Sequence, residues 1–244
     1  MSTENTMSQA QPMLDRGDRT APKRSNRIHC SLLVLLKRIE YLVNSDLLPT
    51  GDSLLDYGCG NKPYKTLFSR KFKTYTGADL VGNPDADLLI DSEGKVQCAD
   101  NSFDCVLSSQ VLEHVTSPQR YLAEARRVLR PGGSLILSTH GIWPYHPDPT
   151  DFWRWTIDGL QEEIKRSGFD IVDVQGVLGL ESAALQLWQD STYDRIPSFV
   201  RPAYAWFFQT CISFIEGRRT ARVSNDSMIF VILARKTLTS LGEG

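Results

Sequence analysis

The chain has 244 residues, of which 41% are hydrophobic and 23% charged, and its formal net charge is -2. This length suits one large domain, and the ordinary globular composition excludes a wholly disordered chain, a collagen-like repeat and a disulfide scaffold. A general nucleic-acid binder carries a basic excess that neutralises phosphates, so we do not expect nucleic acid as a partner. Five cysteines without a CxxC pair, and no secretory signal pattern, lead us to expect reduced thiols and a cytoplasmic location.

The first part of the chain divides into an arm and a helix. Residues 1–27 are polar and poor in aromatic residues, so we predict a disordered arm. Its basic end suits either a solvated tail or contact with an anionic partner. Residues 28–48 carry apolar residues at spacings of three and four, which predicts an amphipathic helix with too few uninterrupted apolar residues to span a bilayer. We expect residues 28–244 to form a single domain.

Strand and helix patterns alternate through most of that domain. Strands are predicted over residues 53–56, 72–76, 86–90, 103–107, 134–138, 169–174 and 228–234, and helices over 63–69, 118–129 and 156–166. Such alternation predicts a mostly parallel sheet with helices on both faces. Residues 178–226 interrupt it with an aromatic-rich stretch, which we interpret as a helical cap insertion. Its aromatic residues suit either packing or contact with a bound acceptor.

A glycine turn follows the first predicted strand. Gly58 and Gly60 come directly after Asp56, at a strand-to-helix turn where the backbone must bend sharply and approach a ligand closely. Asp79 lies 23 residues after Asp56, at the end of the second strand. A carboxylate at that spacing accepts hydrogen bonds from the hydroxyl groups of a ribose. The turn therefore predicts a site for a ribose-containing cofactor.

Two classes of cofactor fit a ribose-binding carboxylate beside such a turn. A dinucleotide site needs a third glycine where the helix begins, so that backbone N–H groups meet the pyrophosphate. This chain has Lys62 and Pro63 there, and proline removes a backbone donor. S-adenosylmethionine carries no phosphate and does not need that donor. The residues of the turn favour it over NAD or FAD.

Five ordered motifs together resemble the class I S-adenosylmethionine-dependent methyltransferases, in the small-molecule branch similar to the ubiquinone-biosynthesis O-methyltransferases. The motifs are residues 56–60 (DYGCG), Asp79, residues 101–107 (NSFDCVL), 111–115 (VLEHV) and 127–133 (RVLRPGG). The resemblance covers about residues 54–174. It implies an α/β fold with a Rossmann-like, seven-stranded, mostly parallel sheet whose last strand is antiparallel, which suits residues 228–234. The missing third glycine is expected to reshape the turn without abolishing cofactor binding.

The resemblance also implies roles for individual residues in holding S-adenosylmethionine. The two glycines of the turn would line its methionine and ribose parts, and Asp56 would brace the turn. Asp79 would hold the ribose hydroxyl groups, and Ser109 would lie next to the methionyl group. Asp91 would reach the adenine amino group, although its loop aligns loosely with the family and a role in the turn is the alternative.

Some relatives bind a divalent ion through an ExxEH arrangement at the end of the fourth strand. The corresponding residues here are Gln110, Glu113 and His114, so the first carboxylate is missing. A neutral amide is a poorer ligand than a carboxylate for a hard cation. We therefore expect no metal site, and we expect activity to survive chelation.

The loop after the fifth strand is the least generic part of the chain. It holds His140 and His146 among three prolines and five large aromatic residues. Ligands bind at the carboxyl ends of strands in such sheets, so this loop can present a base beside an apolar acceptor pocket. The alternative is a rigid loop in which Arg154 pairs with Asp148 or Asp151 and the aromatic residues pack inward.

These observations predict an S-adenosylmethionine-dependent methyltransferase that acts on a small molecule, at a hydroxyl oxygen. His146 or His140 is the candidate general base, with His146 preferred. Two alternatives remain: a methyltransferase of the same fold that acts on nitrogen or on a macromolecule, and a non-catalytic protein that binds the cofactor or a partner. The acceptor and the oligomeric state do not follow from the sequence.

Overall fold

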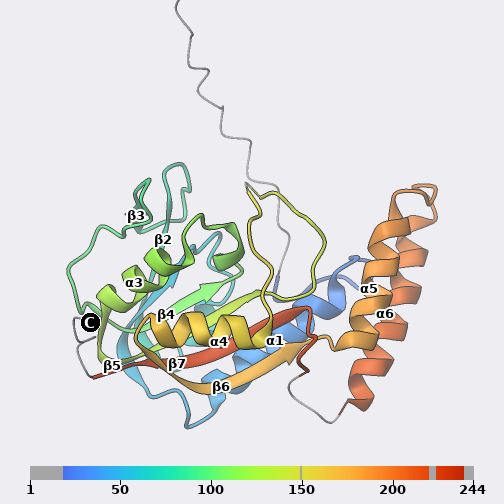
Figure 1. The fold of residues 1–244 in the computed structure, drawn as a ribbon. Helices are drawn as coiled ribbons and strands as arrows, with labels where there is room; N and C mark the ends of the chain where they lie inside the picture. Colours follow the sequence, from blue (N-terminus) through green and yellow to red (C-terminus); the bar gives the residue numbers. More distant parts are fainter. Residues whose placement is uncertain (1–18, 149, 220–223, 239–244) are drawn as a thin grey trace, which may run out of the picture.

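The computed structural model describes residues 19–148, 150–219 and 224–238, and it contains a seven-stranded sheet (Figure 1). The strand order is β3-β2-β1-β4-β5-β7-β6. The strands are β1 Gly51–Tyr57, β2 Phe72–Leu80, β3 Leu88–Ile90, β4 Phe103–Ser109, β5 Leu129–His140, β6 Phe169–Val177 and β7 Ile229–Lys236. Strand β7 runs antiparallel to its neighbours β5 and β6, and the other pairs of named strands are parallel. The predicted Rossmann-like α/β fold is confirmed. Most of the predicted disordered arm, residues 1–18, lies outside the described residues.

Helices cover both faces of the sheet (Figure 1). They are α1 His29–Asn44, α2 Lys65–Phe68, α3 Pro118–Val128, α4 Ile157–Arg166, α5 Leu180–Tyr193 and α6 Arg201–Arg218, with a short 3-10 helix η1 Leu112–His114. Successive strand residues point to opposite faces. Leu135 and Leu137 pack with α3 and α4, while Ile136 packs with α1 and α2. Because helices cover both faces of the sheet, the buried strands consist of continuous apolar runs.

Side-chain caps fix the start of the two helices on one face. Ser117 accepts a hydrogen bond from the backbone N–H of Arg120, and proline occupies the first turn of α3. Thr156 accepts one from the backbone N–H of Gly159 at the start of α4. These contacts satisfy N–H groups that have no partner within the helix. The loop between β5 and α4 therefore has a defined end.

Two helices occupy the region of the expected insertion. α5 and α6 pack against each other beside α1, at the right of Figure 1. Several of the aromatic side chains of this hairpin are exposed: Trp188, Phe199, Trp206, Phe207 and Phe214. Core packing does not account for these rings. The division of the chain into an arm, one domain and a cap stays a prediction.

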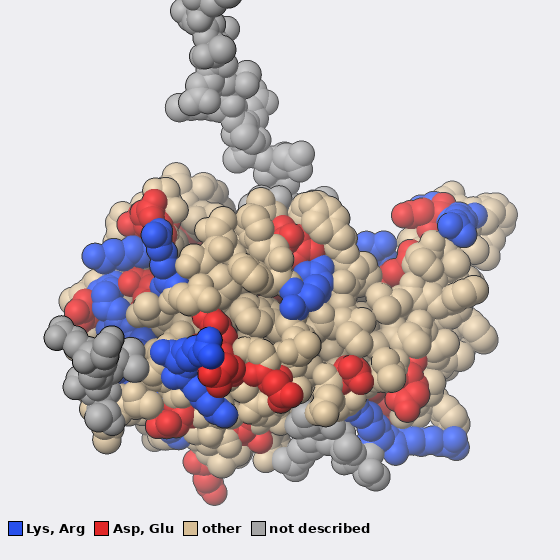
Figure 2. Space-filling model, in the orientation of Figure 1, with Lys and Arg blue, Asp and Glu red and all other residues tan. Residues whose placement is uncertain are grey.

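Charges of both signs lie side by side on the surface in Figure 2, which shows no broad basic area among the described residues of that face. Within the described ranges, none of the helices has the length and apolar content that a bilayer crossing requires.

Three buried glutamines attach the start of α1 to the helical hairpin. The side-chain amides of Gln186, Gln189 and Gln209 all donate to the carbonyl oxygen of Arg27, at 2.8, 2.7 and 2.8 Å. Gln209 also accepts a hydrogen bond from the backbone N–H of Cys30 at 2.7 Å. Buried polar groups must be paired to avoid a desolvation cost. This network therefore specifies where the chain enters α1.

Replacing Gln209 with alanine is expected to lower the free energy of unfolding by about 1–3 kcal/mol, because the buried N–H of Cys30 loses its acceptor. Urea unfolding measures the change. Gln119→Ala, at an exposed position of α3, is the matched control and is expected to change stability by less than about 0.5 kcal/mol. Equal losses in the two variants would contradict the role of Gln209.

Candidate functional site

The turn after β1 depends on its first glycine. Gly58 has a φ of +84°, and a Cβ there would lie 2.5 Å from a methyl group of Val111. Gly60 has a φ of +52°, and a Cβ there would meet nothing within 4 Å. The backbone N–H groups of Gly58 and Cys59 both donate to the carbonyl oxygen of Ala78 on β2. The turn is thus held against β2, with Gly60 beside open space that a ligand can fill.

Asp79 lies next to this open space, at the end of β2. Its Oδ2 accepts hydrogen bonds from the backbone N–H of Gly60 at 2.8 Å and from Nδ2 of Asn83 at 2.7 Å. Its Oδ1 accepts one from the N–H of Leu80 at 2.8 Å. An ionised carboxylate has about four acceptor sites, so capacity for a ribose hydroxyl group remains. Asn83 was not among the site residues expected from the sequence. The only sign of its role there was its position four residues after Asp79.

Asp56 lies beneath the turn and is buried. Its Oδ2 accepts a hydrogen bond from the hydroxyl group of Tyr75 on β2. Burial raises the pKa of Asp56 to about 7, because removal from water disfavours the charged form. The side chain thus connects β1 to β2. Its bracing role stays a prediction.

The other two candidate cofactor residues differ in their surroundings. Ser109 ends β4, and its Oγ lies 3.1 Å from Oγ of Ser138 on β5. Asp91 is exposed, and its Oδ1 accepts hydrogen bonds from the backbone N–H groups of Glu93 and Lys95, both at 2.9 Å. These contacts fit the turn role that was the alternative for Asp91. The predicted contacts of both residues with the cofactor stay predictions.

An ion pair shapes the loop between β5 and α4. The guanidinium of Arg154 binds both carboxylate oxygens of Asp151 at 2.6 Å, one of the two pairings expected from the sequence. Arg154 also donates to the carbonyl oxygens of Trp143 at 2.8 Å and Pro144 at 2.7 Å. Asp151 accepts a hydrogen bond from the backbone N–H of His146 at 2.8 Å. The pair therefore fixes the part of the loop that carries His146.

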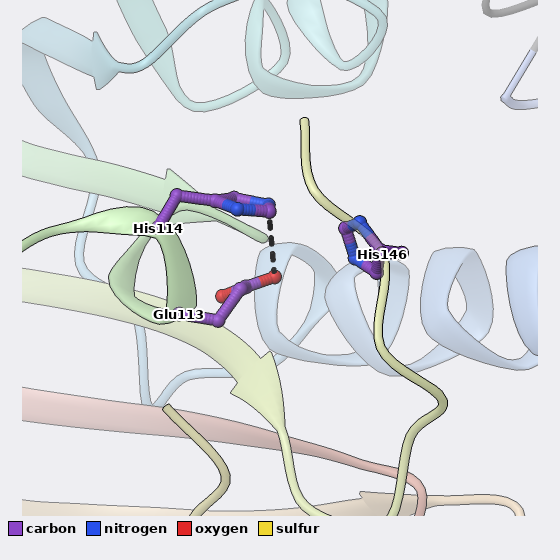
Figure 3. Close-up of side chains that lie close together, drawn as sticks. All are labelled: Glu113, His114 and His146. Atoms are coloured by element: carbon purple, nitrogen blue, oxygen red, sulfur yellow. Dashed lines mark ion pairs between the residues drawn. The ribbon is translucent and has the colours of Figure 1, made fainter. Parts of the chain in front are cut away.

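Three imidazoles and one carboxylate meet beside this loop, and Figure 3 shows three of the four residues. Glu113, in η1, is fully buried, and its Oε1 lies 3.4 Å from Nδ1 of His140 and 3.9 Å from Nε2 of His114. The ring centroid of His146 lies 4.9 Å from those of both His114 and His140. The segment after β4 and the loop after β5 thus bring these groups together.

Burial sets the protonation of this cluster. It lowers the pKa of His140 to about 2 and lowers the pKa of His146, and it raises the pKa of Glu113 to about 7. Near neutral pH both imidazoles are therefore uncharged, and each neutral ring keeps one nitrogen with a free electron pair. His140 is only 2% exposed and stacks on Trp143, whereas His146 is half-buried. An acceptor can reach His146 more readily than His140.

From the sequence alone, Glu113 and His114 were candidates only as metal ligands. Their position beside His140 and His146 depends on how β4 and β5 pair, with Ser109 opposite Ser138. The only sign of this contact in the sequence was the place of the residues along the chain. Glu113 and His114 follow β4, His140 and His146 lie at or after the end of β5, and β4 and β5 are neighbours in the sheet.

Sequence comparisons relate the chain to methyltransferases. A family model described as a methyltransferase domain matches residues 29–210. A ubiquinone biosynthesis O-methyltransferase of Cereibacter sphaeroides is 30% identical over 183 residues, covering 61% of this chain and 74% of the relative. An uncharacterized methyltransferase of a Mycobacterium species is 28% identical over 208 residues, covering 76% and 78%.

Two solved structures show the same fold. The [4+2]-cyclase SpnF has a TM-score of 0.54 at 22% identity, covering 83% of this chain and 81% of its own. The phosphoethanolamine N-methyltransferase 2 of Haemonchus contortus, solved with S-adenosyl-L-methionine, has a TM-score of 0.56 at 15% identity, covering 96% and 61%. At this level of identity the likeness concerns the fold alone.

S-adenosylmethionine fits the edge of the sheet formed by the turn and Asp79. The open space beside Gly60 admits a ligand, and the adjoining carboxylate has acceptor capacity for its ribose. Lys62 and Pro63 lie where a pyrophosphate would need backbone donors, and a sulfonium cofactor has no such need. The observed turn thus agrees with the choice of cofactor made from the sequence.

Asp79→Ala is expected to weaken S-adenosylmethionine binding by about 100-fold or more, because hydrogen bonds to a charged group contribute about 1.5–3 kcal/mol each. Calorimetry on the purified variant measures the affinity, and circular dichroism checks that it is folded. Asp46→Ala, at an exposed position before β1, is the matched control. Binding within a few-fold of wild type in a folded Asp79→Ala protein would show that the ribose contact is wrong.

Asp56→Asn is expected to reduce the pH dependence of stability. Between about pH 4 and 7 the unfolded chain loses the Asp56 proton while the folded protein keeps it, so the free energy of unfolding falls as the pH rises. Asparagine has no such proton, so the fall is smaller in the variant. Urea unfolding at the two ends of this range measures it. Identical pH dependence in both proteins would contradict the raised pKa.

Proposed function

Because the chain belongs to the class I S-adenosylmethionine-dependent methyltransferases, we propose that it methylates a small molecule at a hydroxyl oxygen, with His146 as the general base. S-adenosylmethionine is its methyl donor. The observation that carries the proposal is the position of His146, a half-buried, uncharged imidazole on the loop after β5. Relatives named as ubiquinone biosynthesis O-methyltransferases support the choice of oxygen.

The chain has two tasks in this reaction. When bound, S-adenosylmethionine supplies an electrophilic methyl group on a sulfonium sulfur. The protein must align the acceptor oxygen with that methyl carbon and exclude water. With the acceptor aligned in this way, a ring nitrogen of His146 would take the proton that the hydroxyl group loses as its oxygen gains the methyl group. Because the imidazole starts uncharged, it can take this proton.

The surroundings of His146 suit an apolar acceptor. The ring of Trp143 lies 6.4 Å from that of His146, centroid to centroid, and stacks on His140 at 4.5 Å. Trp153 stacks on Trp155 and donates its indole N–H to the carbonyl oxygen of Val115. Rigid aromatic rings offer apolar contact area. A hydroxylated ring is therefore the acceptor class that we propose.

The reaction is tested with isotopically labelled methyl donor and a panel of phenols, catechols, aliphatic alcohols and amines. We expect labelled methyl ethers, identified by product mass, from hydroxylated rings. Label found only on amines would instead favour nitrogen methylation. A chain that binds the donor but labels no compound, in the presence or absence of a cell metabolite extract, would favour the non-catalytic alternative.

Replacing His146 with alanine is expected to lower turnover by about 10²–10⁴-fold, the usual contribution of a positioned general base. Donor affinity should change little, since the ring lies on the acceptor side of the proposed site. His140→Ala tests the second candidate. Because the His140 side chain is buried, we expect a smaller loss of turnover than in His146→Ala, provided that the variant folds. His29→Ala is the control, because His29 lies at the start of α1. Near-normal turnover in both His146→Ala and His140→Ala would exclude these two residues as the base.

A further inference from the structure

We infer that Glu113, His114 and His146 form a binding site for one divalent transition-metal ion, such as zinc, and that the bound ion blocks methyl transfer. One ligand atom from each of these residues lies within 4.8 Å of the other two (Figure 3). The binding part of this inference stands on geometry alone. The inhibitory part rests on the proposed role of His146.

A hydrogen bond made by His114 leaves its other ring nitrogen free to bind a metal ion. Its Nδ1 is hydrogen-bonded to the backbone carbonyl oxygen of Thr150, and a carbonyl oxygen only accepts, so Nδ1 carries the hydrogen. In the neutral ring, Nε2 then has the free electron pair, and Nε2 is the atom that faces Oε1 of Glu113 at 3.9 Å. Histidines that bind metals commonly donate their other N–H to a carbonyl oxygen in this way.

Glu113 supplies a carboxylate oxygen that lacks a hydrogen bond. Its Oε2 accepts from Oγ1 of Thr139 at 2.8 Å, which fixes the carboxylate. Its Oε1 is fully buried and has no hydrogen-bond partner among the residues that the structure describes. The same holds for Nδ1 of His140, which lies 3.4 Å from this oxygen. Unpaired buried polar atoms are costly, and a cation placed among them would satisfy them.

The ligand types select the class of ion. Two imidazole nitrogens and one carboxylate oxygen suit zinc and the neighbouring transition metals, whereas magnesium and calcium prefer oxygen ligands. Zinc ligands lie about 2 Å from the ion, so binding requires the three side chains to draw closer together. His146 lies on the loop and is half-buried, which makes it the ligand with the most room to move.

This ligand set differs from the ExxEH arrangement considered above. Gln110, which occupies the first position of that arrangement, has a φ of +60° and donates its side-chain amide to Oγ of Ser138 at 3.2 Å. His146 comes instead from the loop after β5. An ion bound through His146 uses the electron pair that would accept the proton of the acceptor. Metal binding and the proposed base role are therefore mutually exclusive at this ring.

Calorimetric titration of EDTA-treated, dialysed protein with zinc chloride tests the site without any assay of turnover. We expect saturation at one zinc ion per chain, at least about 100-fold tighter than magnesium. His114→Ala and Glu113→Gln should each weaken zinc binding by about 10-fold or more, and His114→Ala keeps the test valid if the buried Glu113 variant fails to fold. His29→Ala, which removes the one histidine outside the cluster, should bind zinc like wild type. No saturable binding, or equal affinity in His114→Ala, would overturn the site.

Turnover measurements test the inhibitory part separately. The EDTA-treated enzyme is expected to keep full activity, to lose about 10-fold or more with one equivalent of zinc, and to recover when EDTA is added again. Activity that requires zinc, or that is unaffected by zinc at a saturation established by calorimetry, would overturn inhibition while leaving the binding site intact. Failure of the proposed methylation reaction would leave the calorimetric test unchanged.

Discussion

The parallel pairing of β1, β2, β4 and β5 is the constraint on which the candidate site depends. Parallel neighbours have their carboxyl ends at the same edge of the sheet, so the segments that follow them meet there. Tyr57 pairs with Ala78, and Ser109 pairs with Ser138. The first pairing brings the glycine turn to Asp79, and the second brings the Glu113 segment to the loop that holds His146. Both halves of the site therefore come from strand register.

Within that frame, two polar networks hold the irregular segments in place. The Arg154–Asp151 pair, in the last part of the loop after β5, binds backbone groups in the first part of that loop, so the loop has one defined path despite its lack of regular structure. The three glutamines around the carbonyl oxygen of Arg27 do the same where the chain enters α1. In each case a buried or half-buried side chain replaces the backbone hydrogen bonds that a helix or strand would supply.

The two halves of the site differ in how their polar atoms are satisfied. Around Asp79, donors from Gly60, Leu80 and Asn83 surround a carboxylate that remains partly open to a ligand. Around Glu113, burial leaves one carboxylate oxygen without a hydrogen bond and keeps the imidazoles of His140 and His146 uncharged. The first arrangement suits recognition of hydroxyl groups. The second suits groups that accept a proton or a cation, so the two halves of the candidate site differ in their chemistry.

The sequence by itself determined the fold and the methyl donor, and it predicted which residues hold that donor. Apolar periodicity located the strands, and the turn at Gly58 was recognisable because its positive φ requires glycine locally. Only the tertiary structure decided that Glu113 meets His140 and His146, because that contact depends on the β4–β5 register and on the path of a loop. It also decided that His140 is buried while His146 remains accessible, since burial is set by packing between distant segments and has no local sequence pattern.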